Sequence, residues 1–222
     1  MKRRVFIAIP VPENMKKKAG EWQKKHADLK VRWIKPENLH ITVIPPWYVD
    51  ENQLYEVARL LPFTLKGLES FPILFSKVLL GPPGQQSRLL WAEGITPKKF
   101  IPPPSQNTPQ LAAGMNGRRR NPSRGVQYPA GKVGGFIELK EGFEEALLAN
   151  PKTGFYKKES RPAKLHLTIA RFRPGSIKKL PQPTGVVNWN FKVGEVNLME
   201  SRLQKGGAEY AVLESVKFGP DF

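Results

Sequence analysis

Two segments of the chain repeat one five-residue pattern, and each carries an imidazole beside a hydroxyl group. They are residues 39–43 (LHITV) and residues 165–169 (LHLTI). Side chains alternate between the two faces of a β-strand, so a histidine and a threonine two positions apart share a face, about 7 Å apart along the strand. The apolar residues between them then face a core. Each segment is therefore predicted to be a strand with one apolar face and one reactive face.

Displacement at phosphorus is the chemistry that these groups can perform together. Imidazole titrates near neutral pH and can accept or donate a proton, and a threonine hydroxyl can donate a hydrogen bond to a phosphate oxygen. If the two units face each other across a cleft, one histidine can act as base on the entering oxygen and the other as acid on the leaving oxygen. The candidate residues are His40, Thr42, His166 and Thr168.

The repeat is specific because both residue types are rare in this chain. There are three histidines and seven threonines among 222 residues, and chance places a threonine two positions after two of the histidines in about 0.3% of such chains. The alternative is two ordinary strands with incidental cross-strand pairs of His and Thr. The third histidine, His26, shares a predicted helical face with Met15, Ala19, Trp22 and Leu29, and it is predicted to be a packing residue.

Charge and composition narrow the class of protein. The net charge is +17, from 36 basic and 19 acidic residues, and such an excess attracts phosphate polymers, although it also serves solubility. The absence of cysteine excludes disulfide scaffolds, cysteine-ligated metals and thiol nucleophiles. No apolar run approaches the roughly 20 residues that span a bilayer, and Pro10 breaks the short apolar run after the basic N-terminus. A cytoplasmic protein without membrane contact is expected.

Local patterns predict a mixed α and β chain. Helices are predicted at residues 13–30, 54–61 and 136–147, the second begun by a capping box of Asp50 and Gln53 and ended by Pro62. Strands are predicted at residues 5–9, 31–34, 39–44, 63–68, 73–80, 88–92, 163–172, 187–193, 195–203 and 210–218, with a hairpin turn at 206–207.

One domain, residues 1–222, is predicted, with an insertion at about 96–135. That stretch holds seven prolines, six glycines, seven Lys or Arg residues and no acid. Such a composition offers little to bury, so a flexible basic insertion is expected.

The repeated His-x-Thr motif resembles that of the 2H phosphoesterase superfamily, and specifically of the RNA 2′,3′-cyclic phosphodiesterases, also called 2′-5′ RNA ligases. Further segments are similar to that family: residues 4–9 (RVFIAI), 31–42 (VRWIKPENLHIT), 88–91 (RLLW), 161–171 (RPAKLHLTIAR) and 198–210 (LMESRLQKGGAEY). Two departures are Pro45-Pro46-Trp47 after the first motif and Leu165 before the second histidine.

The resemblance implies an α+β bilobal fold in which two antiparallel sheets, related by a pseudo-twofold axis, line a central cleft with helices outside. It implies His40 as proton donor, His166 as proton acceptor, and Thr42, Thr168 and Arg171 as phosphate-binding residues. Strict alternation would place Arg171 on the face opposite His166. The implied reaction opens RNA 2′,3′-cyclic phosphate ends to a 2′-phosphate, with reverse-type 2′-5′ ligation as a second activity.

The resemblance further implies no cofactor and no metal, a monomer, and RNA substrates that include tRNA-like fragments. Two other readings remain open at this stage. One is a non-catalytic RNA-binding module that uses the basic surface. The other is a 2H phosphodiesterase acting on a different cyclic phosphate. If the pure protein opens a cyclic phosphate, it is an enzyme and not a non-catalytic binding module. Which cyclic phosphate it opens then decides between an RNA end and a different substrate.

Overall fold

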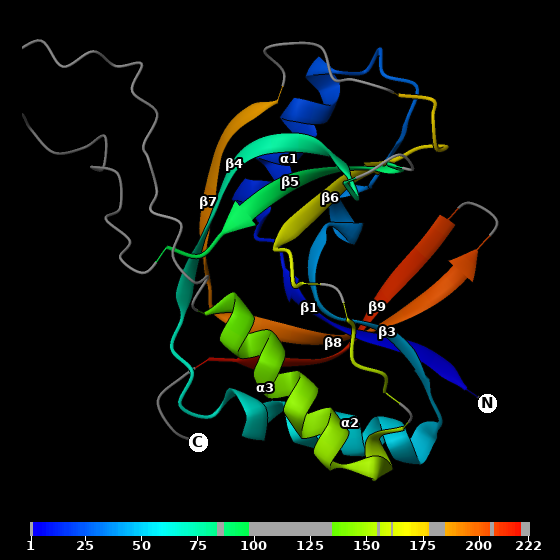
Figure 1. Cartoon of the computed structure of the whole chain (residues 1–222), viewed down its shortest axis with the longest axis vertical. Coiled ribbons are helices and arrows are strands. Elements are labelled where there is room, and N and C mark those ends of the chain that lie inside the picture. The colour runs from blue at the N-terminus through cyan, green and yellow to red at the C-terminus, as the bar shows by residue number, and fades with distance from the viewer. Residues whose placement is uncertain are drawn as a thin grey trace, which may run out of the picture.

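Two antiparallel sheets form the framework of the computed structural model, which describes residues 2–83, 87–97, 135–154, 156–160, 162–177, 185–204 and 207–218. One sheet has the order β3-β1-β8-β9 and the other β2-β6-β5-β4-β7 (Figure 1). The strands are β1 (Arg3–Pro10), β2 (Arg32–Trp33), β3 (His40–Val49), β4 (Phe71–Gly81), β5 (Leu89–Ile95), β6 (His166–Arg171), β7 (Val186–Val193), β8 (Glu195–Gln204) and β9 (Gly207–Lys217).

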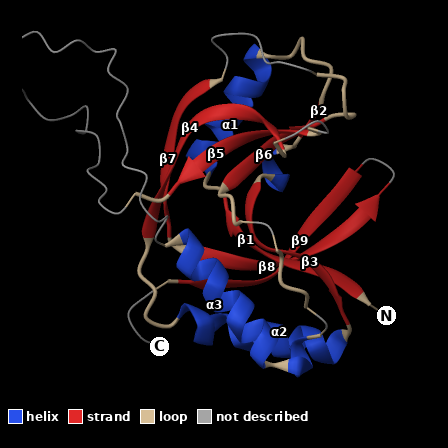
Figure 2. Ribbon diagram, viewed as in Figure 1, coloured by secondary structure: helices blue, strands red, loops and turns tan. Residues whose placement is uncertain are grey.

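Helices cover the outer sides of the two sheets (Figure 2). Helix α1 (Glu13–Lys25) lies against the five-stranded sheet, and α2 (Glu51–Leu65) and α3 (Phe136–Ala149) lie side by side against the four-stranded one. Two short 3₁₀ helices, η1 (Pro36–Asn38) and η2 (Pro151–Thr153), complete the described elements. The expected α+β bilobal architecture is thereby confirmed.

The second helix departs from the sequence prediction. The capping box of Asp50 and Gln53 is present, but α2 continues through Pro62 to Leu65, so the strand predicted at 63–68 is wrong. Proline removes one hydrogen bond of the helix. The buried stripe of Val57, Leu61 and Leu65, which belongs to the main hydrophobic core, outweighs that loss. A proline therefore does not end a helix whose apolar face is buried on both sides of it.

The predicted insertion at 96–135 lies outside the described residues except at its ends. The side chain of Thr96 is buried, and Gly135 has a φ of +61° with no space for a side chain, since a Cβ there would lie 2.6 Å from Phe71. Both ends thus belong to the folded part of the chain. Of the predicted hairpin turn, Gly206 lies outside the described residues and Gly207 already begins β9.

The two repeated segments meet where the sheets meet. His40 is the first residue of β3 and His166 the first of β6, and these strands contact each other although they belong to different sheets. Ile41 and Val43, like Leu167 and Ile169, are fully buried, while His40, Thr42, His166 and Thr168 are half-buried. The alternation predicted from the sequence therefore holds over both motifs.

Candidate functional site

The two histidines are held in the same way. Nδ1 of His40 lies 2.8 Å from the carbonyl oxygen of Asn38, and Nδ1 of His166 lies 2.8 Å from the carbonyl oxygen of Lys164. A carbonyl only accepts hydrogen bonds, so Nδ1 carries the proton in both neutral rings. That tautomer leaves the lone pair of each Nε2 available, and each ring is ready to accept or, once charged, donate a proton there.

Both imidazoles also lie against aromatic rings from other strands of the same sheet. The ring centroid of His40 is 5.0 Å from that of Phe6 and 4.8 Å from that of Tyr210, and the His166 centroid is 4.4 Å from that of Trp91. Ring contact and a fixed carbonyl partner together restrict both torsions of each histidine. The two Nε2 atoms are therefore preorganised.

Burial lowers the pKa of both histidines. The pKa of His40 falls to about 4, mainly through desolvation and further through the positive charges of Arg171 and His166, against the opposing effect of the hydrogen bond to the Asn38 carbonyl. Desolvation likewise lowers the pKa of His166, partly opposed by its carbonyl partner and by Glu159. His40 begins β3, and His166 and Arg171 are the two ends of β6, which contacts β3, so the three groups lie in the same region of the molecule.

Each motif is followed by a β-bulge at the same position. In β3, Ile44 and Thr42 pair with the consecutive residues Ile7 and Ala8 of β1, which leaves Val43 as an extra residue. In β6, Ala170 and Thr168 pair with Leu90 and Trp91, which leaves Ile169 as the extra one. The internal repeat thus extends beyond the sequence motif into the backbone geometry.

The bulge corrects the expected orientation of Arg171. Strict alternation would turn it away from His166, but the extra residue Ile169 reverses the alternation, so that Ile169 and Ala170 are both buried and Arg171 is exposed. Its charge reaches His40 and its side chain lines the cleft described below. The position that corresponds to Arg171 in β3 is Pro45, so only the second strand brings a guanidinium group.

A helix side chain holds the carbonyl group of each extra residue. The buried Gln23 of α1 donates from Nε2 to the carbonyl oxygens of Ile169, at 3.1 Å, and Ile34, at 2.9 Å. The buried Lys140 of α3 lies 3.5 Å from the carbonyl oxygen of Val43. Both bulges are thus connected to the helix behind them.

The hydroxyl groups of Thr42 and Thr168 have no hydrogen-bond partner in the part of the chain that the structure describes. They share a face with the histidines and stay half-buried. Each hydroxyl can therefore donate to an oxygen of a bound phosphate without giving up a bond inside the protein.

A cleft of about 530 Å³ lies between the two sheets next to His40, although none of the four motif residues itself lines it. Asn38, whose carbonyl holds His40, and Tyr210, whose ring packs against it, both line this cleft. The charged residues along its walls are Arg4, Arg32, Lys35, Arg171 and Glu209. The excess of positive charge suits an anionic ligand.

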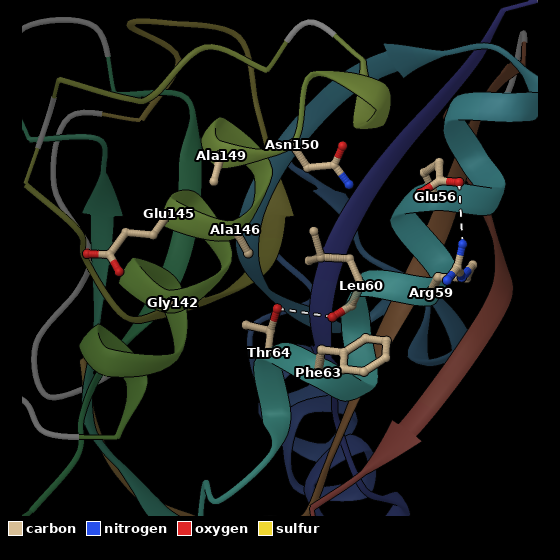
Figure 3. Close-up of a pocket in the computed structure, with 10 residues that line it drawn as sticks. All are labelled: Glu56, Arg59, Leu60, Phe63, Thr64, Gly142, Glu145, Ala146, Ala149 and Asn150. Atoms are coloured by element: carbon tan, nitrogen blue, oxygen red, sulfur yellow. Dashed lines mark hydrogen bonds and ion pairs between the residues drawn. The ribbon is translucent and has the colours of Figure 1, made fainter.

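A second cavity, of about 600 Å³, lies between α2 and α3 (Figure 3). Its side chains include Leu60, Phe63 and Ala146, and its ion pair joins Arg59 to Glu56 over 3.7 Å. Its lining residues lie on α2, on α3 and at Asn150, and none of them is a residue that holds or contacts His40, unlike Asn38 and Tyr210 in the first cleft. The cleft beside His40 is therefore the better candidate for the functional site.

The grouping and the hydropathy of the described residues bear on metal binding and on membrane spanning in this part of the chain. No group of three or more His, Asp or Glu side chains is placed to hold a metal ion there. No described helix is long and apolar enough to cross a membrane.

Comparisons with known proteins agree with the motif. Residues 9–91 match the LigT like phosphoesterase family. An RNA 2′,3′-cyclic phosphodiesterase of Methanothermobacter thermautotrophicus is 30% identical over 102 residues, which are 45% of this chain and 55% of that protein. One of Thermotoga maritima is 37% identical over 70 residues, 31% of this chain and 37% of that protein. The chain thus matches about half the length of these relatives or less.

Solved structures share the fold over almost the whole chain. The crystal structure of E. coli LigT complexed with 3′-AMP superposes with a TM-score of 0.66 at 19% identity, covering 98% of this chain and 99% of that one. The structure of the protein TT0787 of Thermus thermophilus gives a TM-score of 0.67 at 18% identity, covering 99% and 100%.

Sequence reasoning missed the groups that orient the histidines and form the cleft. The carbonyl groups of Asn38 and Lys164 carry no residue signature, although their equal offset from the two histidines is visible once the fold is known. The aromatic residues Phe6 and Tyr210 reach His40 from β1, which neighbours β3, and from β9, at the far edge of the same sheet, and such contacts appear only in the folded chain.

Proposed function

We propose that this chain, a LigT-like phosphoesterase by its sequence match and its fold, opens RNA 2′,3′-cyclic phosphate ends to 2′-phosphates. The proposal rests on the symmetric pair of histidines, each with Nδ1 bonded to a carbonyl oxygen and Nε2 available. Beside them are two threonine hydroxyls that have no hydrogen-bond partner among the described residues. The names of the matched relatives support RNA cyclic phosphates as the substrate class.

In the proposed reaction, Nε2 of His166 takes a proton from water as the water oxygen attacks phosphorus. The bond between phosphorus and O3′ breaks, and His40, charged in the bound complex, donates its proton to O3′. Water is added overall, and the products are a 2′-phosphate and a free 3′-hydroxyl. Thr42, Thr168 and Arg171 bind the non-bridging oxygens, whose negative charge grows in the transition state.

The phosphate charge also accounts for how a histidine with a pKa of about 4 can serve as an acid. A negative charge close to an imidazole favours its protonated form. Binding of the phosphodiester anion beside His40 therefore raises the pKa of that ring, while Arg171 and His166 lower it in the free protein. Substrate binding and protonation of His40 are thus coupled.

The test is turnover of a short oligoribonucleotide that ends in a 2′,3′-cyclic phosphate, in EDTA and without nucleotide, with the product phosphate identified. We expect a 2′-phosphate. Turnover that requires a divalent metal would overturn the two-histidine mechanism, and no turnover of any cyclic phosphate would favour a non-catalytic RNA-binding module. The same assay with 2′,3′-cyclic nucleotides of other kinds tests the remaining substrate classes.

The separate roles of the histidines have their own test. A substrate with sulfur in place of O3′ has a leaving group that needs no proton. His40→Ala should then recover most of its lost rate on the sulfur substrate, whereas His166→Ala should not. The reverse pattern would exchange the two roles.

The proposal extends to the setting of the reaction: a monomer in the cytoplasm that acts on RNA ends, including tRNA-like fragments. The basic cleft supports an RNA substrate. The proposal includes reverse-type 2′-5′ ligation, in which a 5′-hydroxyl takes the place of water in the same displacement, so that no further catalytic group is needed. A mixture of an RNA with a 2′,3′-cyclic end and an RNA with a 5′-hydroxyl end tests this activity.

A further inference from the structure

Two arginines stand directly opposite each other at the entrance to the site. In the ladder between β2 and β6, Arg32 pairs with Arg171. Like charges at directly opposed positions of an antiparallel pair destabilise the sheet. Both side chains are exposed, and neither has a carboxylate partner among the residues that the structure describes. The fold therefore keeps an uncompensated pair of cations beside the phosphate site.

Two more cations face the same cleft. Arg4 lies on β1, where Nη1 donates to Oγ of Ser201 over 3.0 Å, so its guanidinium is held in place although it has no acidic partner among the described residues. Lys35 follows β2 on the opposite wall. The cations that line the cleft thus come from both sheets and converge on the space between them.

The direction of the reaction decides what enters this space. In an in-line displacement the leaving oxygen departs on the side opposite the attacking water. If His166 activates the water and His40 protonates O3′, the ribose lies on the His40 side of phosphorus. The cleft lies on the same side of phosphorus as His40, because Asn38 and Tyr210 both contact His40 and both line the cleft.

We propose that the cleft formed by Arg4, Arg32 and Lys35 binds the 5′-phosphodiester of the terminal nucleotide. This inference rests on the proposed function and specifies its substrate as an RNA end instead of a free cyclic mononucleotide. The 5′-phosphodiester is the next negative charge along the chain from the cyclic phosphate. Its binding neutralises the repulsion between Arg32 and Arg171, so the catalytic phosphate and the 5′-phosphodiester are bound by neighbouring cations.

The experiment compares two substrates that differ only in this group: a nucleoside 2′,3′-cyclic phosphate with a 5′-hydroxyl, and the same nucleoside with a 5′-methyl phosphodiester. We expect the wild-type protein to favour the diester by about tenfold or more in kcat/KM, as a charge-assisted contact supplies. The variants Arg32→Gln, Arg4→Gln and Lys35→Gln should each reduce that preference, through KM, because each should lose more kcat/KM on the diester than on the 5′-hydroxyl substrate.

The matched control is Arg59→Gln, which removes the same charge from α2, away from the cleft, and should keep the preference. Equal rates on both substrates in the wild type, or equal loss on both in Arg32→Gln, would overturn the proposal. Binding of the two matching nucleoside 2′-phosphates, measured by calorimetry, reports on the cleft without turnover. A protein that binds the diester better but opens neither substrate would refute the proposed function alone.

Discussion

The strands β3 and β6 are alike in their histidine motifs and bulges, and they differ in the residue that follows the bulge. In β3 and β6 the histidine, the threonine, the carbonyl partner of Nδ1 and the bulge all coincide. After the bulge, β6 has Arg171 and β3 has Pro45. The symmetric parts are those that we propose to transfer protons and to hold the phosphate. The unequal part gives one side of the phosphate an added positive charge, which suits a substrate whose two sides differ.

The supports behind the bulges differ as well. Gln23 holds the bulge of β6 with a neutral amide. Lys140, behind β3, belongs to a buried network in which its Nζ lies 2.8 Å from Glu144, and Glu144 also accepts from Tyr156 and pairs with Lys158. Burial alone would raise the pKa of Glu144, but Lys140, Tyr156 and Lys158 outweigh it and lower that pKa. A repeated backbone feature can thus be held by unrelated chemistry.

The largest expected effect concerns the histidines themselves. His40→Ala and His166→Ala should each lower turnover by about 10² to 10⁴, the usual contribution of one positioned acid or base. Acid and base act as a unit, so the double variant should lose less than the product of the two effects. Affinity for RNA, measured by fluorescence anisotropy, should change little. His26→Ala is the control and should affect only stability, because His26 stacks on Trp22 outside the site.

The two bulge supports should differ in their contribution to stability. Lys140→Met leaves the carboxylate of Glu144 buried with fewer partners, and breaking a buried ion pair costs about 3–5 kcal/mol. Gln23→Met, the matched variant, removes two hydrogen bonds to carbonyl groups and should cost about 1–3 kcal/mol. Urea unfolding measures both. Equal losses would show that the ion pair adds nothing beyond a neutral hydrogen bond.

The phosphate contacts should show the asymmetry of the strands. Thr42→Val and Thr168→Val each remove one donor and should cost about 1–3 kcal/mol in kcat/KM. Arg171→Gln should cost at least as much, since charged hydrogen bonds are the stronger ones, and Pro45→Ala should cost nothing measurable. Similar losses for Arg171→Gln and Pro45→Ala would contradict the asymmetry. Steady-state kinetics on one oligonucleotide suffices.

The pH dependence should lie on the acid side of the ordinary imidazole range. The limbs of kcat/KM report the pKa values of the free enzyme, and burial lowers those of both His40 and His166. The lower limb should therefore fall near 4 and the upper one below 6.5. Bound phosphate raises the pKa of His40, so the profile of kcat should move to higher pH. Two limbs near the ordinary imidazole value in kcat/KM would contradict the lowered pKa values.

The histidines and threonines of the proposed site could be identified from sequence because they belong to a short repeated motif. Period-two alternation placed the histidines and threonines correctly, since it depends only on backbone geometry over a few residues. It failed at Arg171, where the bulge adds a residue, and a bulge carries no residue signature in this chain. The cleft also escaped prediction, because Arg4, Arg32 and Lys35 are brought together by strand order across two sheets.

The helix boundaries show the same limit. The capping box was predictable from Asp50 and Gln53 because capping is local. The continuation of α2 past Pro62 was not, because it depends on burial of Leu61 and Leu65 in a core that is assembled from segments far apart in the sequence.

The smallest effect on stability is expected from removal of residues 98–134 and closure of the gap with a short glycine-rich linker, keeping Thr96 and Gly135. Thr96 is buried and Gly135 packs against Phe71, so the cut must fall between them. Loop closure changes by only about 0.6 kcal/mol per doubling of length. The free energy of unfolding should therefore rise by about 1–2 kcal/mol at most, and turnover of a short substrate should stay at the wild-type level.

The segment holds seven Lys or Arg residues, so binding of longer RNA should weaken and depend less steeply on salt. The matched control keeps the full length and changes Arg118, Arg119, Arg120 and Arg124 to Gln, which separates lost charge from lost length. A deletion variant that does not fold would show that the segment belongs to the core, and an unchanged salt dependence would show that its charges do not contact RNA.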